Sequence, residues 1–363
     1  MRTGSEALWL ISGVGAKGPA CFLLETASLR IMLDLGEGPP PGLLPPVNSL
    51  GPIDALVLSH GHKDHIGGLA LLPALGNPPV YATAIVARAL PKGIDVRPLP
   101  LNGTDDVLGI EVTTGRNGHA PGGIWVHFDI GGGLLYTGDW SSESILYAYD
   151  PPAKTACVAL LDCSYARHDR SLSDCWNDLA RLVEHGPLLL PVPANGRGAE
   201  IALALVRGGF EDIFVDEAMQ KALQRLCDGE AGSLRAGVAG EVARLAGITK
   251  PIDGARGTML AASADGTAGT SARLLKEWES AEAPAIAFTG YMPPQTPAQR
   301  LTKSGRAQFV RWNVHPRISD VVALVRAVKP RTVIPAFCDR SQLPGLAEDL
   351  APARVVMDGP IKL

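Results

Sequence analysis

The stretch that most constrains this chain is the run of residues 58–68, in which three His and one Asp fall within six positions (His60, His62, Asp64 and His65). The apolar run of residues 55–58 comes before these four residues and the Gly pair at 67–68 comes after them, which predicts a buried strand that ends in a tight loop. In such a loop His60 and His62 point one way and Asp64 and His65 another, so one turn can serve two cations. Imidazole nitrogen and carboxylate oxygen are ligands typical of Zn²⁺, with Mn²⁺ or Fe as substitutes. Chance clustering on a solvated loop is a weak alternative, because the chain has only eight His.

Three further segments extend this pattern along the first 140 residues. An apolar stretch ends in Asp34, and His119 lies in Gly-His-Ala-Pro-Gly. Asp139 lies in Thr-Gly-Asp-Trp. In order and spacing, these segments and the His-x-His-x-Asp-His run resemble the metallo-β-lactamase superfamily. The resemblance implies that Asp139 bridges two metals and that Asp34 orients the His-rich loop without touching metal. The implied metal ligands are His60, His62, Asp64, His65, His119 and Asp139.

The rhythm of apolar runs changes near residue 171 and predicts two parts. Residues 1–150 alternate short apolar runs with Gly, Pro and Asp, which is typical of a strand-rich layer. From residue 171 an amphipathic helix capped by Ser173 precedes a buried strand and an Ala/Leu-rich helix, the alternation of an α/β unit. With the resemblance, we expect an α/β protein whose core is an αββα sandwich of residues 1–170 and 286–363. Residues 171–285 are expected to form an inserted α/β cap.

The second half of the chain carries further motifs. They are Leu-Asp-Cys-Ser-Tyr around Asp162, Gly-Arg-x-x-Glu around Arg197, the Ser/Gly loop with Ser263, and Trp-Asn-Val-His ending at His315. These motifs resemble the β-CASP branch of the superfamily, which includes ribonuclease J and mRNA 3′-end-processing endonucleases. The resemblance implies that Asp64, Asp162 and His315 are catalytic. It also implies that Arg197 and Ser263 bind substrate.

One position departs from the pattern of that branch. There, a strand shortly after the catalytic His ends in a His that binds the second metal, and counting on through residues 329–336 of this chain places Phe337 at that position. A phenyl ring cannot bind a metal, so a Cys338 thiolate, an Asp339 carboxylate or water would have to replace the ligand. The sequence also permits a site that holds one metal firmly.

The ligand set predicts hydrolysis of a phosphoester. Two cations about 3.5–4 Å apart share a hydroxide whose pKa falls toward ~7, and they neutralise the phosphate under attack. The leaving alkoxide needs a proton, for which His315, oriented by Asp162, is the candidate donor. The predicted function is therefore that of a metal-dependent phosphodiesterase or nuclease that cleaves RNA or single-stranded DNA through a metal-bound hydroxide. An aromatic content of 5% offers few rings for stacking bases, which weighs against a nucleic acid as substrate. The alternatives are a hydrolase of a small phosphodiester or other ester and a non-catalytic scaffold.

Charge and composition bear on partners and compartment. The net charge is −4, yet residues 291–340, the basic segment, hold nine cations against two acids. Such a segment indicates a phosphate-bearing partner near one edge, with ordinary solvated side chains as the alternative. Arg197, at a predicted helix start, suits phosphate as well, with an ion pair to Glu200 as its alternative.

Two further properties bear on location. The longest apolar runs fall short of the ~20 residues that span a bilayer, which predicts no membrane partner. The six Cys form no C-x-x-C pair, which favours a reducing cytoplasm. A homo-oligomer is left open.

Overall fold

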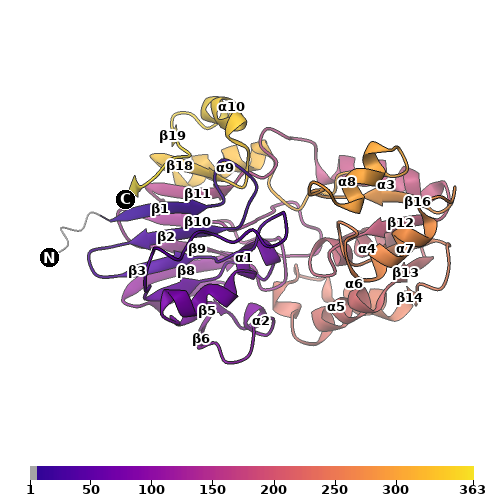
Figure 1. Ribbon diagram of the computed structural model, residues 1–363, viewed down its shortest axis with the longest axis horizontal. Helices are drawn as coiled ribbons and strands as arrows, with labels where there is room; N and C mark the ends of the chain where they lie inside the picture. The colour runs from indigo at the N-terminus through magenta and orange to yellow at the C-terminus, as the bar shows by residue number, and fades with distance from the viewer. Residues whose placement is uncertain (1–5) are drawn as a thin grey trace. The chain divides into compact units, whose positions relative to one another are not determined.

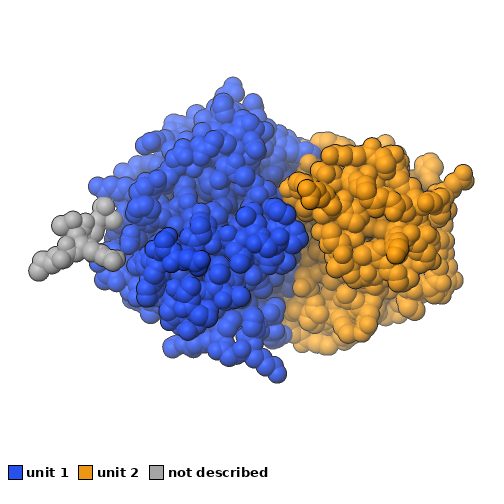
Figure 2. Space-filling model, viewed as in Figure 1, with its two compact units in different colours: residues 1–142, 149–169, 315–363 blue, residues 143–148, 170–314 orange. Residues whose placement is uncertain are grey.

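The computed structural model describes residues 6–363, which form two compact units (Figure 2). Unit 1 comprises residues 1–142, 149–169 and 315–363, and unit 2 comprises residues 143–148 and 170–314. The first five residues of the expected core lie outside the described part. The predicted α/β fold class is confirmed.

Within residues 6–363, unit 1 contains two seven-stranded sheets (Figure 1). The first has the order β20 (Ile361–Lys362), β1 (Ala7–Ser12), β2 (Cys21–Glu25), β3 (Arg30–Leu33), β4 (Ala55–Val57), β5 (Val80–Thr83) and β6 (Val96–Leu99). The second has the order β19 (Arg354–Val355), β18 (Thr332–Ala336), β11 (Val158–Asp162), β10 (Leu134–Tyr136), β9 (Ile124–Phe128), β8 (Ile110–Arg116) and β7 (Gly103–Val107).

The two sheets of unit 1 pack on one another because successive side chains of a strand point to opposite faces. In β2, Phe22 and Leu24 lie in the core shared by both sheets, and Leu23 lies in the outer cluster of the first sheet. The outer layer of the first sheet is α1 (Lys63–Ile66), the 3₁₀ helix Leu69–Leu75 and α2 (Ala84–Ala87). The outer layer of the second sheet is α9 (Ile318–Val328) and α10 (Leu343–Asp349), and the 3₁₀ helix Arg340–Gln342 directly precedes α10. These layers give the predicted αββα arrangement.

Unit 2, whose residues are all described, has one parallel sheet of six strands. Its order is β14 (Lys250–Pro251), β13 (Ile213–Val215), β15 (Thr258–Ala261), β12 (Leu188–Pro191), β16 (Ala285–Phe288) and β17 (Gln308–Phe309). Its helices are α3 (Leu172–Glu184), α4 (Arg197–Arg207), α5 (Glu217–Asp228), the 3₁₀ helix Ala231–Ser233, α6 (Ala239–Ile248), α7 (Gly269–Trp278) and α8 (Pro297–Lys303). None of the helices within residues 6–363 is long and apolar enough to cross a bilayer.

Two local expectations differ from the structure. Helix α3 is capped by Ser171 rather than Ser173, because the Ser171 hydroxyl accepts from the backbone N–H of Asp174 while the Asp174 carboxylate accepts from the backbone N–H of Ser171. The chain returns to unit 1 at His315 instead of at residue 286. The reason is that β16 pairs in parallel with β12 and β17 pairs in parallel with β16, so both strands belong to the sheet of unit 2.

The basic segment is divided between the two units at residue 315. In unit 1, Arg317 lies 2.9 Å from the carboxylate of Asp320. Arg340 lies 2.7 Å from the carboxylate of Asp358. Because these two cations have acidic partners, the structure favours ordinary surface charge as the interpretation for Arg317 and Arg340.

Candidate metal centre

Three loops from the two sheets of unit 1 meet at one edge of the sandwich. The His-rich loop follows β4, the loop with His119 connects β8 to β9, and Asp139 follows β10. The backbone N–H of Ile124 donates to the carbonyl of Ser59 at 2.8 Å, which fixes the His-rich loop to the second sheet. Each candidate ligand follows the end of a strand. The residues directly after such a strand lie at the edge of the sandwich.

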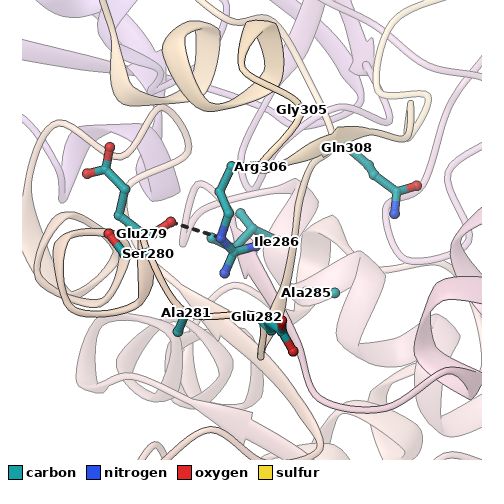
Figure 3. Close-up of a pocket in the computed structure, with 9 residues that line it drawn as sticks. All are labelled: Glu279, Ser280, Ala281, Glu282, Ala285, Ile286, Gly305, Arg306 and Gln308. Atoms are coloured by element: carbon teal, nitrogen blue, oxygen red, sulfur yellow. Dashed lines mark hydrogen bonds between the residues drawn. The ribbon is translucent and has the colours of Figure 1, made fainter.

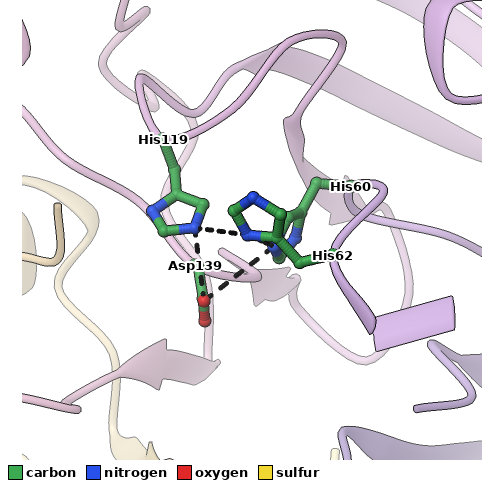
Figure 4. A group of neighbouring side chains, drawn as sticks. All are labelled: His60, His62, His119 and Asp139. Atoms are coloured by element: carbon green, nitrogen blue, oxygen red, sulfur yellow. Dashed lines mark hydrogen bonds and ion pairs between the residues drawn. The ribbon is translucent and has the colours of Figure 1, made fainter. Parts of the chain in front are cut away.

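The first metal group consists of His60, His62, His119 and Asp139, whose ligand atoms all lie within 4.8 Å of one another (Figure 4). Nδ1 of His62 lies 3.1 Å from Nε2 of His60 and 3.0 Å from Nε2 of His119. Oδ2 of Asp139 lies 3.5 Å from Nε2 of His119 and 3.9 Å from Nε2 of His60. A tetrahedron with bonds of about 2.1 Å has edges of about 3.4 Å, so these four atoms fit one Zn²⁺ ion.

Electrostatics keep the imidazole of His60 in the form that binds metal. The ring is fully buried, and burial lowers its pKa well below the ordinary value. The neighbouring rings of His65 and His62 lower this pKa further. A neutral imidazole offers a lone pair to a cation, so the donor set is chemically ready for a metal.

The second metal group consists of Asp64, His65 and Asp139. Nε2 of His65 is buried, lies 3.3 Å from Oδ1 of Asp139, and has no hydrogen-bond partner within the described residues. Burial lowers the pKa of His65, but the carboxylates of Asp139 and Asp34 raise it well above the usual value. The local field therefore favours positive charge at this position.

The carboxylate of Asp34 orients the His-rich loop through hydrogen bonds. It accepts hydrogen bonds from the backbone N–H of Ser59 at 2.7 Å, from the Ser59 hydroxyl at 2.6 Å and from Nδ1 of His65 at 2.7 Å, and also from the hydroxyl of Tyr136. Because Nδ1 of His65 donates to Asp34, Nε2 is turned toward Asp139. This is the position that the expected orienting role requires.

A third cluster places His315 beside the metal groups. Nδ1 of His315 donates to Oδ2 of Asp162 at 2.8 Å and lies 3.7 Å from Oδ2 of Asp139. Its ring lies 5.0 Å, centroid to centroid, from the His119 ring at a tilt of 38°, and 5.0 Å from the Tyr165 ring in an edge-to-face contact. Asp162 ends β11, and its carboxylate also accepts from the backbone N–H of Ser164 at 2.9 Å. Because Nδ1 is engaged by Asp162, Nε2 is the ring nitrogen of His315 that is available for proton transfer.

The side chain of Phe337 occupies the position where the sequence departs from the family pattern. Its ring lies 5.2 Å from the His65 ring and 6.3 Å from the ring of Phe22, centroid to centroid. The Cys338 thiol belongs to the outer apolar cluster of the second sheet, and its burial raises its pKa to about 12. The Asp339 carboxylate is exposed and accepts from the backbone N–H of Ser341. Neither Cys338 nor Asp339 therefore replaces the ligand, and two of the three expected substitutes are wrong.

Arg197 and Ser263 lie in unit 2, on the loops after β12 and β15, which are adjacent strands. Arg197 is the first residue of α4, and its guanidinium lies against Gly290, where a Cβ would approach Nη1 to 1.9 Å. The Ser263 hydroxyl donates to Asp265 at 2.9 Å. Glu200, offered above as an alternative partner of Arg197, accepts instead from the Ser144 hydroxyl and the Trp312 indole.

Unit 2 also has a hollow of about 450 Å³ between the end of α7 and β17 (Figure 3). Arg306 lines it, and its guanidinium donates to the backbone carbonyls of Glu279, Trp278 and Pro284. Because this guanidinium holds backbone carbonyls, it has a structural role. The hollow adds nothing to the metal chemistry.

Sequence reasoning missed Lys17, which the structure places among the carboxylates of the site. It lies in the Gly-rich loop between β1 and β2, and its charge interacts with Asp64, Asp139 and Asp162. A lysine in a Gly-rich loop was the only signal in the sequence.

Comparisons with known proteins agree with this geometry. A sequence model of the metallo-β-lactamase superfamily matches residues 14–191. The transcription termination factor FttA of Methanothermobacter thermautotrophicus is 26% identical over 270 residues, which cover 59% of this chain and 42% of that protein. Ribonuclease J 1 of Streptococcus pyogenes serotype M3 is 31% identical over 104 residues, which cover 26% of this chain and 18% of that protein.

A solved structure agrees in fold over the full length. The crystal structure of a protein of unknown function from Enterococcus faecalis V583 has a TM-score of 0.63 and 14% identity, and the match covers 99% of this chain and 100% of that one. At this identity the likeness shows the fold alone. The chain spans less than half the length of the curated relatives described above.

Proposed function

Because this chain contains a metallo-β-lactamase superfamily domain, we propose that it is a metal-dependent phosphodiesterase that acts on RNA or single-stranded DNA. The observation that carries the proposal is the first metal group, in which three imidazoles and one carboxylate converge with the spacing of a tetrahedral ion. The relatives named as a ribonuclease and a transcription termination factor support a nucleic acid as the substrate.

The proposed ion is Zn²⁺, held by His60, His62, His119 and Asp139, with Mn²⁺ or Fe as substitutes. When bound, it would supply the positive charge that activates a water molecule and neutralises a phosphate under attack. The chain keeps Asp139 ready for this role, because its carboxylate stays ionised. Burial raises its pKa, but the charges of His65 and His315 hold it well below the usual value.

His315 is proposed to give a proton to the leaving oxygen. Asp162 accepts from Nδ1 at 2.8 Å, which fixes the ring and leaves the transferable proton on Nε2. Asp64 contributes negative charge beside His65 and Asp139.

Arg197 and Ser263 are proposed to bind the phosphate backbone of the substrate. The carboxyl ends of parallel strands are the usual ligand edge of such sheets, and both residues follow strands there. Arg197 also begins an eleven-residue helix, where backbone N–H groups and a guanidinium favour an anion. All six Cys, each among the described residues, are free thiols, which supports the reducing cytoplasm as the proposed compartment.

The test is a substrate panel with matched metal measurements. Purified protein is incubated with labelled single-stranded RNA, single-stranded DNA and bis-p-nitrophenyl phosphate, with and without a chelator. We expect cleavage of at least one nucleic acid, its loss with the chelator, and its loss in Asp139→Asn. Cleavage of the small diester alone would favour the small-substrate alternative. No hydrolysis by protein that carries metal would favour the non-catalytic alternative and contradict the proposal.

A further inference from the structure

The three residues that lead into His315, residues 312–314, form the return segment and are buried in unit 2. Trp312 and Val314 belong to an apolar cluster of that unit, and Asn313 between them is fully buried. The backbone N–H of Trp312 donates to the carbonyl of Thr289 at 3.0 Å. The backbone of His315 therefore starts from a fixed point.

The Asn313 amide joins the return segment to two other parts of unit 2. Its Nδ2 donates to Oε2 of Glu143 at 3.1 Å and to the carbonyl of Arg170 at 2.7 Å. The Cys175 thiol donates to Oδ1 of the same amide across 3.6 Å. Oε1 of Glu143 accepts from the backbone N–H of Leu172 at 3.0 Å. Both ends of the amide are engaged, and the opposite orientation would turn its oxygen toward a carboxylate.

A second carboxylate holds the same two stretches of chain. Glu200 of α4 is 2% exposed and accepts from the Trp312 indole N–H at 3.0 Å. It also accepts from the Ser144 hydroxyl at 2.6 Å and from the backbone N–H of Ile145 at 2.7 Å. Residues 143–145 and the return segment are therefore cross-linked by two buried or half-buried carboxylates.

These cross-linked stretches continue along the chain into the candidate metal centre. Asp139 precedes Glu143 by four residues, and His315 follows Asn313 by two residues. Nδ1 of His315 donates to Asp162 at 2.8 Å, and a hydrogen bond weakens steeply when its donor is moved or turned. A change in the return segment is thus transmitted to the ring of His315 through two peptide units.

We propose that Asn313 and Glu143 are positioning residues, which fix the place of His315 for proton transfer by holding the return segment. Their role rests on the proposed function, because they place its proton donor. Neither side chain touches a metal group. A displacement of about 1 Å at a reacting group costs about 10²-fold in rate, so a pair of hydrogen bonds two residues away is sufficient to control the reaction.

The experiment begins with Asn313→Asp in the full chain. This change removes both donated hydrogen bonds and sets a second carboxylate against Glu143. We expect cleavage of RNA to be about 10–10²-fold slower at unchanged metal content. The loss on bis-p-nitrophenyl phosphate should be smaller, because its leaving group departs without a proton.

A second substitution tests the pair itself. Adding Glu143→Gln to Asn313→Asp reverses the direction of the hydrogen bond, since the new amide donates to the new carboxylate and its oxygen still accepts from Leu172. We expect the double variant to cleave RNA at least about threefold faster than Asn313→Asp does. No recovery would show that the two side chains do not act as a pair.

Two control variants separate positioning from general damage. Asn177→Asp makes the same chemical change at an exposed position of α3 and should leave both rates unchanged. Leu274→Ala removes a buried side chain from a different apolar cluster of unit 2 than that of Trp312. It should lower the unfolding midpoint but keep the ratio of the RNA rate to the aryl diester rate.

A readout without substrate distinguishes this role from the proposed function. The proton on Nδ1 of His315, which is hydrogen-bonded to Asp162, should give a downfield NMR signal, identified by its loss in His315→Ala. The signal should disappear in Asn313→Asp and return in the double variant. If this pattern is found in protein that hydrolyses nothing, the positioning of His315 is supported and the hydrolase proposal fails.

The opposite outcomes overturn the positioning role alone. An unchanged signal with unchanged rates in Asn313→Asp would reject it and leave the hydrolase proposal intact. Equal losses on RNA and on the aryl diester would also reject it. If Asn313→Asp does not fold, Asn313→Ala removes the amide without adding charge, and the same rates and signal are expected of it.

Discussion

Replacing Asp34 by Asn tests the hydrogen-bond network that supports the His-rich loop. The carboxylate is fully buried and accepts four hydrogen bonds. One oxygen receives the backbone N–H of Ser59, and the other receives the Ser59 hydroxyl, His65 and Tyr136. Asn has one acceptor oxygen, so in its better orientation the amide N–H₂ faces the Ser59 N–H.

The smallest expected loss is therefore one charge-assisted hydrogen bond plus a buried unpaired donor. Such a loss costs about 2–3 kcal/mol of unfolding free energy. For a unit of this size, about 2–3 kcal/mol corresponds to a fall of roughly 5–10 °C in the unfolding midpoint. Asp34→Ala leaves all four donors without an acceptor from residue 34, so its unfolding midpoint should fall further.

The assay is thermal unfolding followed by circular dichroism, with a chelator present so that bound metal does not mask the difference. The matched control is Asp54→Asn, because the exposed Asp54 carboxylate accepts only one backbone hydrogen bond, from Arg30 at 2.7 Å. We expect a shift of less than about 2 °C there. A midpoint of Asp34→Asn within 2 °C of the unaltered protein would refute the reasoning.

Three other predictions concern the metal, the proton donor and pH. His60→Ala should lose Zn²⁺ measured by mass spectrometry, and retention of a full equivalent would show that the first metal group is not the site. His315→Ala should keep its metal and lose about 10²–10⁴-fold in rate on RNA, with a smaller loss on an aryl diester whose leaving group needs no proton. Equal losses on both substrates would reject the role of proton donor. Burial raises the pKa of Asp150, but Arg116 lowers it to about 2. The stability this pair contributes is present above about pH 4 and is lost as pH falls toward 2, so the midpoint difference between Asp150→Asn and the unaltered protein should narrow from pH 7 to pH 3. A constant difference would contradict the pairing.

Much of the site was predictable because its residues lie in short runs. A metal-binding loop needs several ligands on one turn. His60, His62 and Asp64 therefore lie close together in the sequence, and together they indicate a metal site. Strand ends could be recognised for a similar reason, since an apolar run that stops at a Gly or Asp leaves the sheet there. The predicted apolar run before the His-rich loop and the strand before Asp139 correspond to β4 and β10.

Other features depended on contacts between residues far apart in the chain. The boundary at His315 could not be read locally, because a short apolar strand such as β16 has the same pattern whichever sheet it joins. The orientation of Cys338 also needed the fold, since a residue after a strand can face either layer.

By itself, the sequence determined the class of fold and the candidate metal ligands of the chain, because periodic burial and clustered ligands are local properties. Only the tertiary structure decided what stands around the second metal group. The packing of Phe337 on His65 joins two segments that lie more than 250 residues apart along the chain. Charge balance in a buried site is set by distance in space, and no spacing along the chain encodes it.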